Sequence, residues 1–87
     1  MMKNRKGTKD LCYLSELKKG EKAVIENIEV VEKIFRQRLF EMGITQGVVV
    51  KIKKIAPLGD PVGIEIRGYE LCVRKNELKK ILAKVVK

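Results

Sequence analysis

The most informative absence from this sequence is histidine, which does not occur in its 87 residues. Histidine is the usual general base near neutral pH, so its absence removes every Ser-His and Cys-His nucleophile arrangement. The carboxylates are dispersed, and neither Gly59 nor Gly63 begins a phosphate-binding loop, because no Lys-Ser or Lys-Thr follows. We therefore expect a protein without enzymatic activity.

Cysteine is also scarce, with only Cys12 and Cys72 far apart in the chain. Two cysteines do not make a disulfide framework, and two thiols without histidine make a poor tetrahedral metal site. We predict that Cys12 packs against the first turn and that Cys72 faces solvent. We also predict no dedicated metal site and no cofactor, and we leave weak transition-metal binding open.

Long hydrophobic runs are missing as well. No apolar run approaches the roughly 20 residues that cross a bilayer. The basic N-terminus is not followed by the hydrophobic segment of a secretory signal. These features predict a cytoplasmic protein.

The residues that are present suit one small globular domain. Hydrophobic residues make up 45% and charged residues 36% of the chain, a balance that is not typical of disorder. The net charge is +9, of which residues 1–10 carry +3 and residues 75–87 carry +4. We predict a flexible basic tail at 1–10 and a folded domain at 11–87.

An apolar stripe predicts a helix over residues 31–42. The members of this stripe, which recur at helical spacing, are Val31, Ile34, Phe35, Leu39 and Met42. We expect that face to enter the core and Gly43 to end the helix, because glycine adopts the left-handed C-cap conformation without a steric penalty. Phe40 lies nearly opposite the centre of the stripe.

Alternating apolar and polar residues predict short strands around this helix. Within 48–55, for example, Val48, Val50 and Ile52 fall on one face. The predicted strands are 23–28, 48–55, 62–67, 70–74 and 81–86, with helical turns at 13–17 and, capped by Asn76, at 76–80. The pattern predicts a mainly β fold, namely an SH3-like small β-barrel with an inserted α-helix.

Nucleic-acid binding is the alternative function that the charges leave open. Lys51, Lys53 and Lys54 adjoin on one strand, and Arg67 and Arg74 lie on later strands, where they could contact phosphates. Base stacking needs exposed aromatic residues, however, and the chain has only four aromatics. We therefore favour a solvated strand face and expect nucleic acid to be an unlikely partner.

Three motifs carry a family resemblance by their order and spacing. They are Met-Gly-Ile at 42–44, Ala-Pro-Leu-Gly-Asp-Pro at 56–61 and Arg-Gly-Tyr at 67–69. Over about residues 14–86 the chain resembles the FeoA-like family of ferrous iron transport proteins. The resemblance implies an SH3-like barrel that is a non-enzymatic accessory or regulatory protein of ferrous iron uptake.

The resemblance also implies a partner, the membrane ferrous iron transporter FeoB with its cytosolic GTPase region. Docking there would place the protein at the inner face of the membrane, with no small-molecule substrate of its own. Open strand edges leave self-association as a further option.

The candidate partner-binding residues are an aromatic, a proline-stiffened loop and two arginines. Phe40 is either a docking anchor or packs beneath the first turn near Tyr13 or Leu14. The loop is either a docking element that loses little entropy or an ordinary hairpin connection. The arginines pair either with a partner or with glutamates of this chain. The full set is Arg38, Phe40, Pro57, Leu58, Gly59, Asp60, Pro61 and Arg67.

Overall fold

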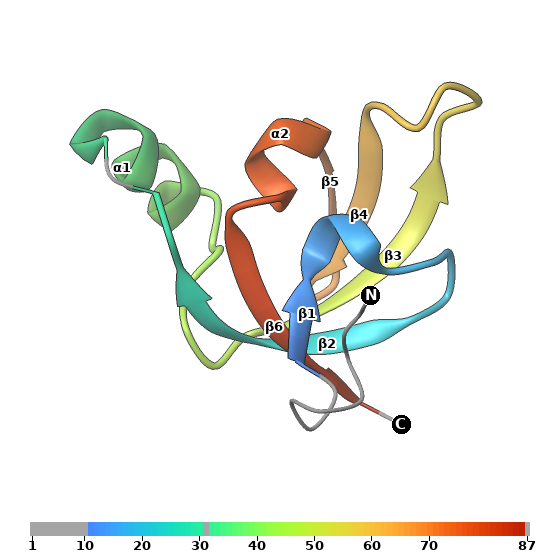
Figure 1. Cartoon of the computed structure of the whole chain (residues 1–87), viewed down its shortest axis with the longest axis horizontal. Coiled ribbons are helices and arrows are strands. Elements are labelled where there is room, and N and C mark those ends of the chain that lie inside the picture. Colours follow the sequence, from blue (N-terminus) through green and yellow to red (C-terminus); the bar gives the residue numbers. More distant parts are fainter. Residues whose placement is uncertain (1–10, 31, 87) are drawn as a thin grey trace.

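Six antiparallel strands form one curved sheet (Figure 1). The computed structural model describes residues 11–30 and 32–86, so the basic tail predicted at 1–10 lies outside the described residues. Neighbouring strands follow the order β1-β6-β2-β3-β4-β5. Their bounds are β1 Leu11–Tyr13, β2 Lys22–Ile28, β3 Val49–Ile55, β4 Val62–Ile66, β5 Tyr69–Val73 and β6 Ile81–Val86.

The sheet curls without closing into a complete barrel. In the described part of the chain, β1 and β5 are its two edge strands and do not pair with each other. A bulge between Ile25 and Asn27 bends β2, because an extra residue increases the local twist. β2 therefore pairs with β3 through its first residues and with β6 along its length. The short helices η2 (Leu14–Glu16) and α2 (Lys75–Leu78) contact each other beside the sheet (Figure 1).

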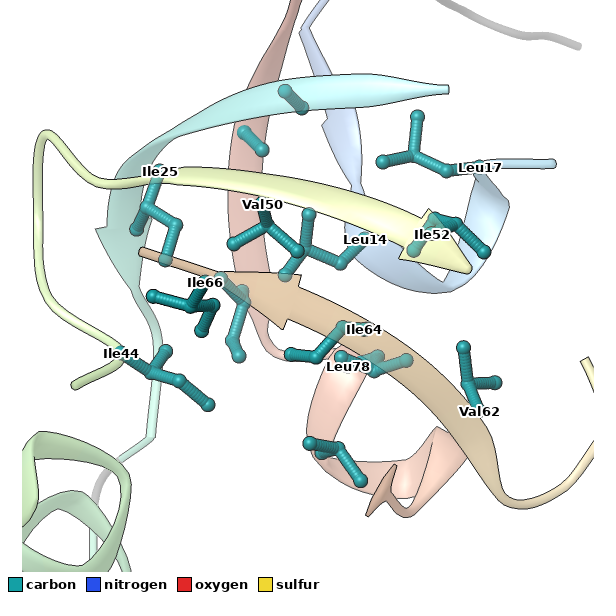
Figure 2. Close-up of a cluster of buried hydrophobic side chains, with 14 of the residues drawn as sticks. Leu14, Leu17, Ile25, Ile44, Val50, Ile52, Val62, Ile64, Ile66 and Leu78 are labelled. Atoms are coloured by element: carbon teal, nitrogen blue, oxygen red, sulfur yellow. The ribbon is translucent and has the colours of Figure 1, made fainter. Parts of the chain in front are cut away.

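Aliphatic side chains fill the space inside the curved sheet (Figure 2). Alternate residues of β3 and β4 point inward, as the sequence pattern predicts, and they are Val50, Ile52, Ile64 and Ile66. Leu14 of η2 and Leu78 of α2 complete the same cluster. Burying one such side chain stabilises the fold by about 1.5–3 kcal/mol, so this cluster supplies much of the driving force.

Helix α1 (Lys33–Glu41) ends in a left-handed reversal. The φ angle of Gly43 is +89°. The backbone N–H groups of Gly43 and Ile44 donate to the carbonyls of Phe40 and Leu39 at 3.0 and 2.9 Å. These paired bonds define a Schellman motif, so the predicted role of Gly43 is confirmed. The reversal directs Ile44 into the core, where it is fully buried.

The apolar stripe of α1 is only partly buried. Leu39 is fully buried, and Phe35 and Met42 pack against the core, as predicted. Ile34, however, is 79% exposed, so its predicted place in the core is wrong. Ile34 lies roughly 140° around the helix from Leu39, too far to face the same surface. Val31, the first member of the stripe, lies outside the described residues.

Two local predictions also differ from the structure. Strand β1 was not expected, since three residues are too few to show an alternating pattern. Asn76 does not cap the last helix, because α2 begins at Lys75 with Arg74 at its N-cap. The Lys75 N–H instead donates to Oδ1 of Asp60 at 2.9 Å, so a side chain from the β3–β4 loop satisfies it.

A tyrosine joins the end of β1 to the segment before α1. The Tyr13 hydroxyl donates to Oε1 of Glu29 at 2.6 Å. This hydrogen bond raises the pKa of Tyr13 above its ordinary value, with smaller contributions from partial burial and from the negative charges of Glu29 and Glu16.

Replacing Gly43 by alanine tests the reversal. An added Cβ would meet only Ile66 Cγ2, at 4.0 Å, so the penalty comes from the positive φ and not from a clash. We expect Gly43→Ala to lower the free energy of unfolding by about 1–2 kcal/mol in urea titrations. Lys33→Ala, at an exposed helical position, is the control and should be near neutral. Equal stabilities of the two variants would contradict the role of Gly43.

The Tyr13 bond predicts a pH response. The folded state holds the hydroxyl proton at a pH where the unfolded chain loses it, so the free energy of unfolding should fall as pH rises above about 10. In a Tyr69→Phe background Tyr13 is the sole tyrosine, and its tyrosinate absorbance reports its pKa directly. Glu29→Ala should lower the titration midpoint; an unchanged midpoint would disprove the assigned cause.

Candidate partner-docking site

Helix α1 exposes two bulky apolar side chains. Ile34 is 79% exposed and Phe40 is 63% exposed. The two side chains lie about 120° apart around the axis of α1, which projects from the sheet (Figure 1), and they line different hollows. The exposure of Phe40 shows that it does not pack beneath the first turn near Tyr13 or Leu14. The packing alternative for Phe40 is therefore wrong, and its role as a docking anchor stays a prediction.

A groove of about 360 Å³ runs along the Phe40 side of α1. It lies between α1, the end of β2 and the connection from α1 to β3. Ile28 and Ile44 supply apolar lining opposite Phe40, and Lys33 and Arg36 supply positive charge. Among the described residues no carboxylate lines this groove, and the remaining lining side chains are neutral and polar.

Arg38 is engaged within the chain on the other side of α1. Its Nη2 lies 3.8 Å from Oε2 of Glu77, and its guanidinium lies 5.8 Å from the ring centre of Phe35. Glu77 is buried, and its Oε1 also accepts the Arg74 N–H at 3.3 Å. Of the two alternatives for Arg38, the structure shows pairing with a glutamate of this chain. The contact ties α1 to α2.

The proline-containing loop at 56–61 combines an anchored residue with a projecting one. The Gly59 N–H donates to the Ala56 carbonyl at 2.7 Å, which closes a turn around Pro57 and Leu58. Leu58 at its tip is 95% exposed. The Asp60 carboxylate is directed toward the start of α2. It accepts a hydrogen bond from the Lys75 N–H and lies 3.7 Å from Nη1 of Arg74. Asp60 therefore holds the loop in place.

Arg67 lies in the two-residue turn between β4 and β5. Its φ is +51° and that of Gly68 is +87°, the positive pair that a type I′ hairpin turn requires. Arg67 lines a shallow hollow on the outer face of the sheet together with Lys22, Lys51 and Glu65. This charged face is separate from the groove beside Phe40.

The structure does not bring the predicted residues into one site. Figure 1 shows α1, which carries Arg38 and Phe40, and the β3–β4 loop at opposite sides of the molecule. The prediction missed Lys33 and Arg36, which line the groove with Phe40. A helical projection of the sequence could have identified them, because Lys33 and Arg36 lie within about 40° of Phe40 around the helix axis.

The two cysteines lie where the sequence predicts. Cys12 is buried in the core and Cys72 is exposed on β5. Over residues 11–30 and 32–86, no group of three or more His, Cys, Asp or Glu side chains could hold a metal ion. In the same ranges no helix is long and apolar enough to cross a membrane.

Comparison with known families identifies one domain over almost the whole chain. The model of the FeoA domain matches residues 12–85. A curated protein of Porphyromonas gingivalis, named as a fusion of Fe(2+) transport protein A with the Fe(2+) transporter FeoB, is 37% identical over 73 residues. The match covers 84% of this chain and 8% of that protein, so this chain corresponds to a small part of its relative.

Solved structures agree in fold. The FeoA-like protein of Clostridium acetobutylicum has a TM-score of 0.81 and 35% identity, and the match covers 90% of each chain. The zinc complex of FeoA from Stenotrophomonas maltophilia has a TM-score of 0.73 and 25% identity over 84% of this chain and 89% of that one. That protein is described as a prokaryotic SH3 domain protein and a candidate activating factor of ferrous iron transport. The predicted SH3-like fold is thereby confirmed, with an open sheet.

A more distant likeness concerns fold alone. A manganese-dependent transcriptional repressor has a TM-score of 0.81 but only 10% identity, and the match covers 87% of this chain and 37% of the repressor.

The Arg38–Glu77 contact between α1 and α2 predicts that replacing each residue changes the free energy of unfolding by a different amount. Glu77→Ala removes the buried acceptor of the Arg74 N–H and should lower the free energy of unfolding by about 1–3 kcal/mol. Arg38→Ala removes a side chain that is 61% exposed and should lower it by at most about 1 kcal/mol. Urea unfolding of both single variants and of the double variant measures the difference. A larger loss for Arg38→Ala would contradict this assignment.

Proposed function

This chain belongs to the FeoA domain family, and from that membership we propose that it is a non-catalytic accessory protein that docks on the cytosolic region of the ferrous iron transporter FeoB. The observation that carries the proposal is the Porphyromonas gingivalis relative, in which a domain 37% identical to this chain is part of the same polypeptide as FeoB. Two functions joined in one polypeptide act in the same place, and a separate chain needs a docking surface to achieve this.

The geometry of α1 supports docking. A projecting helix that exposes Ile34 and Phe40 offers apolar area to a partner, and aromatic side chains are enriched among residues that dominate binding energy. The same helix is fixed to the body of the domain by Leu39 and by the Arg38–Glu77 contact. A surface that is already ordered loses less conformational entropy when a partner binds.

Docking on FeoB would hold this chain at the cytoplasmic face of the membrane. The exposed tip of the β3–β4 loop, Leu58, is a second apolar feature that a large partner would reach. Because α1 and this loop lie on opposite sides of the molecule, one small peptide does not span both (Figure 1).

Nucleic-acid binding has less support. The positive charge on the outer face of the sheet is partly neutralised, since Nζ of Lys53 lies 3.6 Å from Oε1 of Glu65. The likeness to the repressor is at 10% identity, so it speaks for the fold and not for a function.

A titration tests the proposed function. Cys72 is exposed and Cys12 is buried, so a maleimide fluorophore should label the native protein selectively at Cys72. We expect saturable binding to the purified cytosolic region of FeoB from the same organism at about 150 mM salt, and no saturable binding to short RNA or DNA. Tight binding to nucleic acid that weakens steeply with salt, with none to the FeoB region, would overturn the proposal.

A further inference from the structure

The groove beside Phe40 has an apolar interior. Ile44 is fully buried beneath it, because the reversal at Gly43 turns that side chain into the core (Figure 2). Ile28 is half-buried along one wall, and Phe40 stands 63% exposed along the other. A groove of about 360 Å³ is at the small end of ligand pockets, and it is open to solvent along its length. It suits a few side chains of a macromolecular segment.

Two cationic side chains line the same groove, and Nε2 of the lining residue Gln37 donates to the Glu41 carboxylate at 3.3 Å. The cations are Lys33 and Arg36, and none of the described lining residues is acidic. Nη1 of Arg36 donates to the Val30 carbonyl at 3.5 Å, which holds the guanidinium near the groove.

The position of Lys33 and Arg36 near the N-terminal end of α1 adds to the positive electrostatic potential of the groove. Lys33 is the first residue of α1, and no acidic residue occupies the first turn. The N-terminal end of a helix already carries partial positive charge, so cations there are less favourable for folding than anions would be. Glu32, at the N-cap, makes no side-chain capping bond and lines a second hollow on α1, and Lys33 lines both this hollow and the groove. The unfavourable placement of charge is offset if an anionic group binds beside it.

From these features we propose that this groove is the docking site for an acidic segment of the transporter's cytosolic region. The segment would insert one bulky apolar side chain against Phe40 and Ile28, and would place carboxylates beside Lys33 and Arg36. The inference rests on the proposed function, and it deepens that function by naming the surface and the chemistry of the partner segment.

Charge argues for this occupant over a second copy of the chain. Two copies each carry a net charge of +9, and a cationic groove does not favour a cationic partner. An acidic segment complements both the apolar interior and the positive rim.

The test compares groove variants with a charge-matched control in the FeoB titration. Phe40→Ala should weaken binding at least about tenfold, as expected for an aromatic anchor. The Lys33→Glu, Arg36→Glu double variant should weaken it by a similar factor. The control is the Lys18→Glu, Lys19→Glu double variant, which makes the same change in net charge at an exposed turn and should bind nearly as the wild type does.

Two further measurements make the assignment specific. In NMR titrations, the amides of Asn27, Gln37 and Thr45, which line the groove, should shift more than those of Leu58 and Arg67. Replacing the acidic residues of the partner segment with lysine should restore binding to the Lys33→Glu, Arg36→Glu variant. Because the substituted side chains are exposed, cooperative melting at or above a temperature close to that of the wild type should confirm that the variants remain folded, with any rise expected in the Lys33→Glu, Arg36→Glu variant.

The outcomes distinguish an error in the proposed docking groove from an error in the proposed function. If the wild type binds FeoB and the groove variants bind equally well, the groove is not the docking site, and the proposed function stands. If the wild type does not bind, both fall. If sedimentation shows a dimer that Phe40→Ala abolishes while FeoB binding is unchanged, a second copy fills the groove and the inference is wrong.

Discussion

The reversal of the chain at Gly43 is the constraint on which the arrangement of α1 depends. Its left-handed backbone lets Ile44 turn back beneath Leu39, and both side chains become fully buried. Through these two residues the helix is joined to the core of the sheet. The next side chain after Leu39 is Phe40, which the helical rotation carries to the solvent side. Burial of Leu39 and exposure of Phe40 therefore follow from one local geometry.

A domain of this size has little interior in which to build a functional site. The space inside the sheet is filled with aliphatic side chains (Figure 2), and the hollows beside α1 and on the outer face of the sheet are open grooves. What such a domain can offer is a fixed surface. Here the fixing is done by side chains that also looked like binding candidates: Asp60 holds the β3–β4 loop against α2, and Arg38 holds α1 near Glu77. Phe40, Lys33 and Arg36 are among the side chains that remain exposed, as are Ile34 and Leu58.

The strands were predictable because successive side chains of a strand point to opposite faces, so that buried and exposed residues alternate in the sequence. Val62, Ile64 and Ile66 alternate with more exposed residues, and each is buried as that alternation predicts. Burial on the helix was harder to predict, because the apolar stripe of α1 is wider than the part of the helix that packs against the core. Ile34 belongs to the stripe by spacing but extends beyond the contact made by Leu39, so the pattern alone assigned it wrongly.

By itself, the sequence determined the strand positions of β2 to β6, the end of α1 at Gly43, and the buried and exposed placements of Cys12 and Cys72. Each of these depends on residues within a few positions of one another. Only the tertiary structure decided which charges pair within the chain and which apolar side chains stay exposed. Asp60 reaches a backbone N–H 15 residues away, and Arg38 meets Glu77 across two helices. Such contacts depend on how separate elements pack in space, which no local pattern records.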